Sequence, residues 1–232
     1  MQLSLPTDEL KSFVLAQLDH FYPDGHSASA MGGGDFNSAF DLALERLEYC
    51  FDHIKIRGYK RTDDGNPLFY HLNSDQYSQF LYYLSNSLWK LNGDKNICDK
   101  LILLNKALHG IWYSYKNNLP NIFLFVHPVG TVLGNVNFSD YLVVYQNVTV
   151  NTIRVGMSEA WAQTFGKGLL LASGSKVIGN ESIGDWVSVG VNTVVYKRAL
   201  PSNSIIYTDS SGAVCLKDYN TKKLLENYFY FE

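Results

Sequence analysis

The sequence predicts an α+β protein in which an N-terminal α-helical domain is followed by a coil of short parallel strands built from hexapeptide repeats. Two observations predict this fold class. Residues 1–119 space their apolar side chains as amphipathic helices do, and from Asn121 onward strand-like apolar runs replace that spacing. In addition, an aliphatic residue recurs every six positions over residues 171–195.

The six-residue repeat is carried by Leu171, Val177, Ile183, Val189 and Val195. A period of six fits neither a helix nor a single strand. It fits a coil of three short strands, in which each hexad forms one flat side and its aliphatic residue points into a narrow interior. The residue after it is small in most hexads, which suits a corner. Stacked coils then bury one continuous core. Two ordinary alternating strands joined by glycine turns are the alternative.

The first half is expected to contain amphipathic helices. Residues 7–21 form a short helix, and residues 22–35 form a loop that ends in a glycine triplet. We interpret the triplet as a connector, because no Gly-Lys-Ser/Thr follows it as a phosphate loop requires. The second helix should start at a cap on Asp35 or Asn37 and run to about Arg57.

The third helix follows a polar loop at residues 58–73. Ser74 is the expected N-cap, and Asn92 with Gly93 should end the helix. Asp94 should open a fourth helix, whose apolar residues are again spaced four and three apart.

The strand-rich domain is expected to span residues 120–209. A buried strand-like run at residues 122–126 should begin its first coils, in a looser register than the later hexads. Residues 151–168 lack the six-residue pattern and are predicted to leave the coil as a loop, and long loops on a rigid scaffold often bind ligands. Residues 210–232 form a tail, either a terminal helix or a strand that packs on a neighbour.

The repeats resemble the left-handed parallel β-helix of hexapeptide-repeat acyltransferases, and more narrowly the serine acetyltransferases. Residues 176–180 and the turn at Leu200-Pro201 carry the resemblance, together with residues 127–134 and 143–150. The left-handed winding is implied by the resemblance alone. The resemblance also implies a homotrimer or a dimer of trimers, with active sites between subunits.

His127 is the candidate catalytic residue. It is similar in its surroundings to the catalytic histidine of serine acetyltransferases, and no other histidine follows residue 109. An imidazole can take the proton of an acceptor hydroxyl as the oxygen attacks a thioester. Three histidines, as in a zinc site of the carbonic anhydrase type, are not present in the predicted coil. Pro128 should confine His127 to extended backbone, and a structural histidine at the domain junction is the alternative.

The chain departs from serine acetyltransferases around this histidine. In that family an Asp precedes the histidine, where this chain has Val126, and a second Asp upstream orients the imidazole, where residues 100–139 contain no acid. A backbone carbonyl, Asp140 or a group from a neighbouring subunit should therefore orient His127. Asp75 is either a carboxylate favoured by a helix dipole or an acceptor-binding acid that reaches toward His127.

The predicted loop at 151–168 also differs from the family. An Arg-His pair there holds the serine carboxylate, and the matching positions here are Trp161 and Ala162. We therefore expect Trp161, with Glu159, to contact a sugar acceptor, and a role for Trp161 as a loop anchor is the alternative.

The donor implied by the resemblance is acetyl-CoA, which lies along the coils in that family. Gly174, Lys176, Gly190 and Lys197 are the expected lining residues, and no metal is expected. The predicted function is thus acetyl-CoA-dependent O-acetylation of a sugar or surface-polysaccharide hydroxyl. The alternatives are serine O-acetylation in cysteine biosynthesis and a non-catalytic trimeric scaffold.

Composition excludes several other classes. The net charge is −3 and no basic run exceeds two residues, which argues against nucleic acid as a partner. No apolar stretch is long enough for a membrane span, and the first residues do not form a signal peptide. Three scattered cysteines, Cys50, Cys98 and Cys215, fit free thiols in a reducing cytoplasm.

Overall fold

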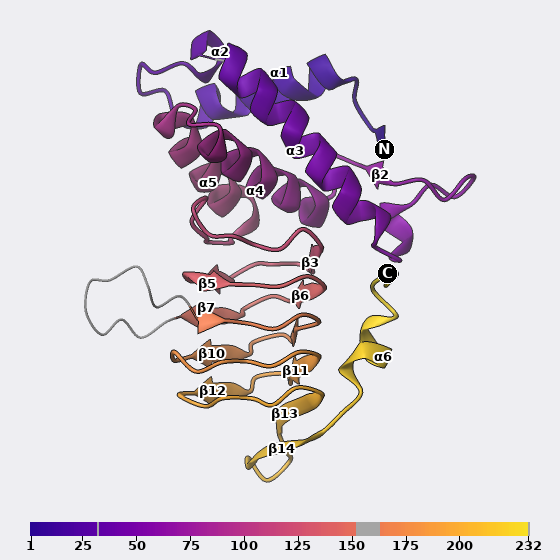
Figure 1. Ribbon diagram of the computed structural model, residues 1–232. Coiled ribbons are helices and arrows are strands. Elements are labelled where there is room, and N and C mark those ends of the chain that lie inside the picture. The colour runs from indigo at the N-terminus through magenta and orange to yellow at the C-terminus, as the bar shows by residue number, and fades with distance from the viewer. Residues whose placement is uncertain (32, 152–162, 232) are drawn as a thin grey trace.

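The computed structural model describes residues 1–31, 33–151 and 163–231, and Figure 1 shows a helical half above a stack of parallel strands. The helices are α1 (Thr7–Phe21), α2 (Ala28–Met31), α3 (Gly34–Asp52), the 3-10 turn η1 (Arg57–Tyr59), α4 (Ser74–Lys90), α5 (Lys95–His109) and α6 (Thr221–Leu225). Helix α4 packs between α3 and α5 and also contacts the first strand of the coil. It therefore connects the two halves of the molecule.

Helix α3 begins earlier and ends sooner than the sequence predicts. Gly33 precedes its first turn, rather than Asp35 or Asn37. The helix ends at Asp52, because Ile54 leaves the helical path to pair with the C-terminal tail. The short helix α2, inside the predicted loop at 22–35, was not expected from the sequence.

The N-cap of α4 is Asn73 rather than the predicted Ser74. The Asn73 side chain accepts the backbone N–H groups of Asp75 at 3.1 Å and Gln76 at 3.2 Å. Both residues are good caps, and only the folded backbone decides which of them stands outside the first turn. The predicted cap of the fourth helix, Asp94, is confirmed at the start of α5.

The strands of the second half form three parallel sides that the chain visits in rotation. The first side contains β3 (Phe123–Phe125), β6 (Leu142–Val144), β9 (Leu170–Leu171), β11 (Val187–Val189) and β13 (Ser204–Thr208). The second side contains β4 (Val132–Leu133), β7 (Thr149–Asn151), β10 (Lys176–Ile178) and β12 (Val194–Tyr196). The third side contains β5 (Val136–Asn137) and β8 (Gln163–Thr164), continued by bridges at Ile183 and Leu200.

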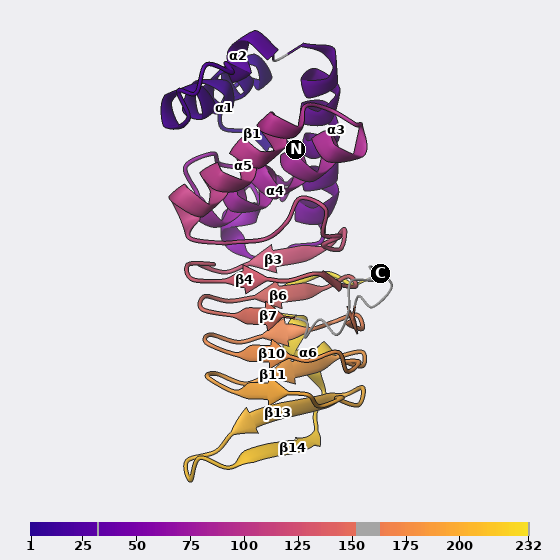
Figure 2. The ribbon, with the colours of Figure 1, turned by 90° about the vertical axis from the view of Figure 1, so that its left-hand side faces the viewer.

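Each pass around the three sides adds one strand to each, so the passes stack below the helices (Figures 1 and 2). The antiparallel strand β14 (Val214–Asp218) pairs with β13 at the far end of the first side. A separate pair, β1 (Gln2–Leu3) with β2 (Leu68–Phe69), ties the N-terminus to the helical half.

The interior of the coil is the one that the six-residue repeat predicts. The five repeat residues, Leu171, Val177, Ile183, Val189 and Val195, are at most 3% exposed. The small residue after the aliphatic one is also explained. At Gly184, a Cβ atom would lie only 2.5 Å from the backbone nitrogen of the next coil. The hexad prediction is therefore confirmed at its interior and at this corner.

The prediction that residues 151–168 form a loop is wrong at the C-terminal end of that range. The described chain resumes at Gln163, which pairs with Val136 on the third side. Phe165 is fully buried and stands six positions before Leu171, in phase with the repeat. An aromatic residue at an otherwise aliphatic position hid this coil from the sequence pattern.

The tail after residue 210 contains the helix α6 and packs on its own chain. Figure 1 shows it running from the end of the coil back toward the helical half. Leu225 and Phe229 are fully buried, and Phe229 pairs with Ile54 just beyond α3. The Tyr228 hydroxyl lies 2.7 Å from that of Tyr145 in the coil. The tail therefore joins the far end of the coil to the helices.

His109, at the end of α5, should make the fold sensitive to acid. Its Nδ1 lies 2.7 Å from Asn105 Oδ1, and burial lowers the pKa of the imidazole to about 4. An unfolded histidine has a pKa of about 6.5, so acid protonates the unfolded chain first. Stability present above about pH 6.5 should fall by up to about 3 kcal/mol on acidification to pH 4. Urea unfolding at several pH values in this range measures the effect. The free energy of unfolding of His109→Gln should depend less steeply on pH than that of the wild type, and an equal pH dependence would contradict the prediction.

Candidate functional site

The edge between the first and second sides is longer in the first coil than in the coils below it. Strand pairing aligns residues 144–149, 171–176 and 189–194. In each of these segments the chain advances five residues as it passes from the first side to the second. The aligned crossing in the first coil, residues 125–132, takes seven. Two additional residues therefore project from the edge, and they fall at 127–128. We call this corner, continued through the coils below, the His127 edge.

His127 stands at the projecting point of this edge. Its side chain is 75% exposed. Its φ is +48°, so the prediction that Pro128 confines it to extended backbone is wrong. The physical reason is the extra length of the first crossing, because an extended His127 would carry the chain away from the second side. A contact to the helical half holds this unfavourable conformation in place.

That contact is made by Asp75 in the first turn of α4. One carboxylate oxygen of Asp75 accepts the backbone N–H of His127 at 3.0 Å, and the other lies 3.3 Å from His127 Nδ1. Asp75 is only 14% exposed at its side chain and lies in the first turn of α4. A proton on Nδ1 would face this carboxylate, and Nε2 would then keep its lone pair for a reacting group.

The structure therefore supplies an Asp–His pair that the local sequence lacks. The partner comes from the helical half and not from the residues just before His127, which is why no motif around His127 revealed it. That Asp75 also binds the acceptor remains a prediction. The signal available in the sequence was an acid in the first turn of a helix, which by itself is more often a structural feature.

Asp140, which was predicted as a group that could orient His127, does not join this pair. Asp140 lies just before β6, and its carboxylate accepts the backbone N–H of Ile122 at 3.0 Å. Ile122 precedes β3 whereas His127 follows it, so Asp140 lies toward the opposite end of that strand. Trp161 and Glu159 lie outside the described residues.

Three of the four predicted donor-site residues lie along the His127 edge. Gly174 and Gly190 occupy the edge in the coils below, and Lys176 follows in β10, where its Nζ donates to the Gly174 carbonyl at 3.1 Å. A Cβ atom on Gly174 would lie 2.1 Å from the side chain of the next coil. Lys197 follows β12, at the other end of the second side, with its Nζ 5.4 Å from the Tyr196 ring centre.

Gln146 is a candidate that the sequence did not indicate. It lies on the His127 edge in the second coil, between His127 and Gly174. Within the described part of the chain, its side-chain carbonyl oxygen is buried and has no hydrogen-bond partner. A buried acceptor without a partner is unfavourable, so a ligand N–H at this edge would satisfy it. Its position on the His127 edge follows from the strand register and from no motif in the sequence.

Two further features of the described ranges concern cofactors and membranes. Among residues 1–31, 33–151 and 163–231, no three His, Cys, Asp or Glu side chains come together in a way that would hold a metal ion. No helix within these ranges combines the length and apolar character that a membrane crossing needs. All three cysteines are free thiols, with Cys50 and Cys98 buried.

Comparison with known proteins gives matches among solved structures alone. No family model matches the sequence, and no curated protein matches it. Serine acetyltransferase isoform 3 from Entamoeba histolytica, in complex with cysteine, aligns at 18% identity with a TM-score of 0.56, covering 94% of this chain and 75% of that one. The serine acetyltransferase from Brucella abortus strain S19, in complex with coenzyme A, aligns at 15% identity with a TM-score of 0.58, covering 78% and 68%.

A truncated serine acetyltransferase apoenzyme aligns at 17% identity with a TM-score of 0.53, covering 62% of this chain. The alignment spans 58% of that apoenzyme's own length. Likeness at such low identity is evidence about the fold and does not by itself transfer an activity. The resemblance predicted from the repeats is thereby confirmed as a shared fold: the chain is folded like the serine acetyltransferases.

Proposed function

We propose that this protein is an acetyl-CoA-dependent O-acetyltransferase built on a left-handed parallel β-helix, with residues 1–119 as helical domain and 120–209 as catalytic domain. The observation that carries the proposal is the His127–Asp75 pair at an exposed corner of the coil. An imidazole held by a carboxylate at Nδ1, with Nε2 open to solvent, is arranged as a general base. The shared fold with acetyltransferases supports the same reaction class.

His127 Nε2 takes the proton of the acceptor hydroxyl as its oxygen attacks the acetyl carbonyl. Asp75 holds Nδ1–H, which fixes the ring orientation and stabilises the imidazolium that forms. His127 then returns the proton to the departing sulfur. Bound acetyl-CoA supplies the acetyl group as a thioester. No covalent intermediate on the protein is required.

The donor fits the His127 edge below the histidine. Gln146 offers a buried carbonyl oxygen without a partner, and the pantetheine arm of coenzyme A carries amide N–H groups that would satisfy it. Gly174 and Gly190 are proposed to line the same edge beside the pantetheine arm. One compared structure is described as a complex with coenzyme A. Lys176 and Lys197 are proposed to contact its phosphates.

The acceptor is proposed to be a hydroxyl of a sugar or surface-polysaccharide precursor. Trp161 would stack on the sugar ring, with Glu159 and Asp75 contributing acceptor contacts. Serine is an alternative that fits the comparisons equally well. The experiment that tests the proposal is incubation with acetyl-CoA and a panel of serine, monosaccharides and oligosaccharides, with thiol release as the readout. A non-catalytic scaffold predicts no release above background with any of them.

A homotrimer or a dimer of trimers is the expected assembly. The outer face of the second side exposes four apolar side chains among polar ones: Trp112, Val132, Val194 and Tyr196 are 37–59% exposed. A neighbouring copy on this face would cover it and would also exclude water from His127. Light scattering should show the trimer or hexamer at micromolar concentration, and a stable monomer would contradict the prediction.

A further inference from the structure

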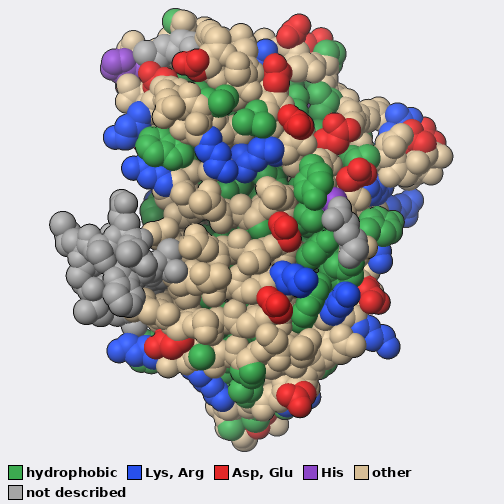
Figure 3. Space-filling model, in the orientation of Figure 1, with side chains coloured by type: hydrophobic (Ala, Val, Ile, Leu, Met, Phe, Trp, Pro, Cys, Tyr) green, Lys and Arg blue, Asp and Glu red, His purple; other side chains and the backbone are tan. Residues whose placement is uncertain are grey.

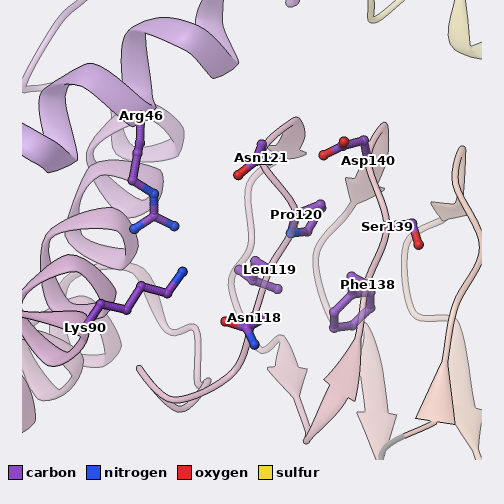
Figure 4. A pocket seen from close by; sticks show the side chains of 9 residues that line it. All are labelled: Arg46, Lys90, Asn118, Leu119, Pro120, Asn121, Phe138, Ser139 and Asp140. Atoms are coloured by element: carbon purple, nitrogen blue, oxygen red, sulfur yellow. The ribbon is translucent and has the colours of Figure 1, made fainter.

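A second candidate site lies between the helical half and the first coil. A cavity of about 400 Å³ opens there, and helices α3 and α4 form one wall while the chain before β3 and β6 forms the other (Figure 4). Its volume falls within the range of small-molecule sites. The lining residues are Arg46, Lys90, Asn118, Leu119, Pro120, Asn121, Phe138, Ser139 and Asp140.

Two cations, Arg46 and Lys90, reach this cavity from the helical wall (Figure 4). The Arg46 guanidinium lies over the Tyr83 ring at 4.7 Å from its centre and donates to the Ser87 hydroxyl at 2.8 Å. These contacts hold its orientation but do not neutralise its charge. Within the described ranges, neither cation has a carboxylate within 4.0 Å. Basic side chains also gather on this face of the helical half in Figure 3.

The two positive charges destabilise one another. The pKa of the Lys90 ammonium is lowered, first by desolvation and then by the charge of Arg46. A bound anion would relieve this repulsion, because it would pair with both groups at once. Arg and Lys are the side chains that most often bind phosphate, Arg through two parallel N–H donors.

The remaining polar groups of the cavity favour a ligand with hydroxyls. Asn118 and Asn121 carry amides that can donate or accept. Asp140 lies on the wall opposite the cations (Figure 4). Its carboxylate accepts the backbone N–H of Ile122 and has further lone pairs for ligand hydroxyls.

We propose that this cavity binds a small phosphorylated, hydroxyl-bearing molecule, with its phosphate on Arg46 and Lys90 and its hydroxyls toward Asp140. The site is separate from the His127 edge. Strand β3 lies between them, and at about 3.3 Å per residue the stretch from Ile122 to Val126 spans roughly 13 Å. The proposal therefore goes beyond the proposed function and does not depend on His127.

Calorimetric titration of the full chain with glucose 6-phosphate tests this site, with glucose and inorganic phosphate as comparisons. Glucose 6-phosphate should bind more tightly than either. Lys90→Gln and Arg46→Gln should each weaken that binding about tenfold or more, because each removes a charge-assisted hydrogen bond. Lys106→Gln, an exposed lysine on α5 outside the cavity, should bind as the wild type does. His127→Ala should also leave the affinity unchanged, whether or not the protein transfers acetyl groups.

Lys90→Gln is the decisive variant, because the Arg46 side chain also packs on Tyr83. Without ligand, Lys90→Gln should keep or raise the melting temperature, since it removes one of two repelling charges. Unchanged affinity in a folded Lys90→Gln variant would overturn the proposal, and so would equally tight binding of glucose. Inorganic phosphate binding as tightly as glucose 6-phosphate would refute the part of the proposal that concerns hydroxyls. Displacement of glucose 6-phosphate by coenzyme A would refute a separate site.

Discussion

Replacement of His127 by alanine should lower kcat for acetyl transfer about 10²- to 10⁴-fold, the usual contribution of a general base. The donor should still bind, because the rest of the His127 edge is untouched. Positioning of the thioester beside the hydroxyl also remains, so the residual rate should exceed the uncatalysed one. Initial rates at saturating acetyl-CoA, together with a direct binding titration of coenzyme A, measure the two effects separately.

Asp75→Asn distinguishes a positioned base from a merely nearby histidine. The asparagine oxygen can still accept the backbone N–H of His127, but its amide group cannot accept from Nδ1. We expect kcat to fall, by no more than in His127→Ala, because the imidazole loses the carboxylate that fixes its tautomer and orientation. A rise in the acceptor KM as well would show that Asp75 also contacts the acceptor. The pH dependence of kcat/KM should contain an ionisation that His127→Ala lacks.

His20→Ala is the matched control, because His20 is an exposed histidine on α1. It should leave the rate unchanged. Wild-type turnover by His127→Ala would assign His127 a structural role at the domain junction and would remove the basis of the proposed mechanism.

Replacement of Phe123 by alanine should destabilise the protein by about 3–5 kcal/mol, as large-to-small changes at buried phenylalanines do. Phe123 is fully buried, and its ring centre lies 5.6 Å from that of Tyr82 and 5.3 Å from that of Tyr83 on α4. Its carbonyl oxygen also accepts from the Gln79 side chain at 2.8 Å. Against a total stability of about 5–15 kcal/mol, this loss is large.

Because Phe123 packs in both halves, the variant should destabilise helices and coil together. Urea unfolding followed by helical circular dichroism and by tryptophan fluorescence should give one coincident transition, shifted in the variant. Phe21→Ala is the control, since Phe21 is 44% exposed and its loss should change stability by no more than about 0.5 kcal/mol. Two separate transitions, of which Phe123→Ala shifts a single one, would show that the halves fold independently.

Much of the architecture could be predicted from the sequence because burial repeats at short range. Leu171 and the four repeat residues after it face the interior because a period of six is visible within one stretch of chain. The helices could be predicted for the same reason, since apolar spacing of three and four is local. Phe165 escaped the prediction because its residue type, and not its phase, differs from the repeat.

The site could be predicted only in part. His127 and Asp75 were both candidates, and the chemistry of imidazole and carboxylate was apparent from residue type. One of two interpretations of Asp75 had it reach toward His127 as an acceptor-binding acid. Its pairing with the imidazole was not predicted, because nothing local relates a helix start to a residue 52 positions later. Arg46 and Lys90 gave no signal at all, since charged residues on helices usually face solvent.

The sequence by itself determined the order of the four longer helices and of the repeats, the residues that fill the coil at 171–195, and the identity of the one imidazole in the predicted coil. The tertiary structure alone decided that His127 projects from the edge with positive φ, that Asp75 holds it, and that the tail returns to Ile54. The physical reason is the range of the interactions. Periodic burial depends on neighbours within one turn or one hexad, whereas strand register, the Asp75 contact and the tail pairing exist only after distant segments have packed.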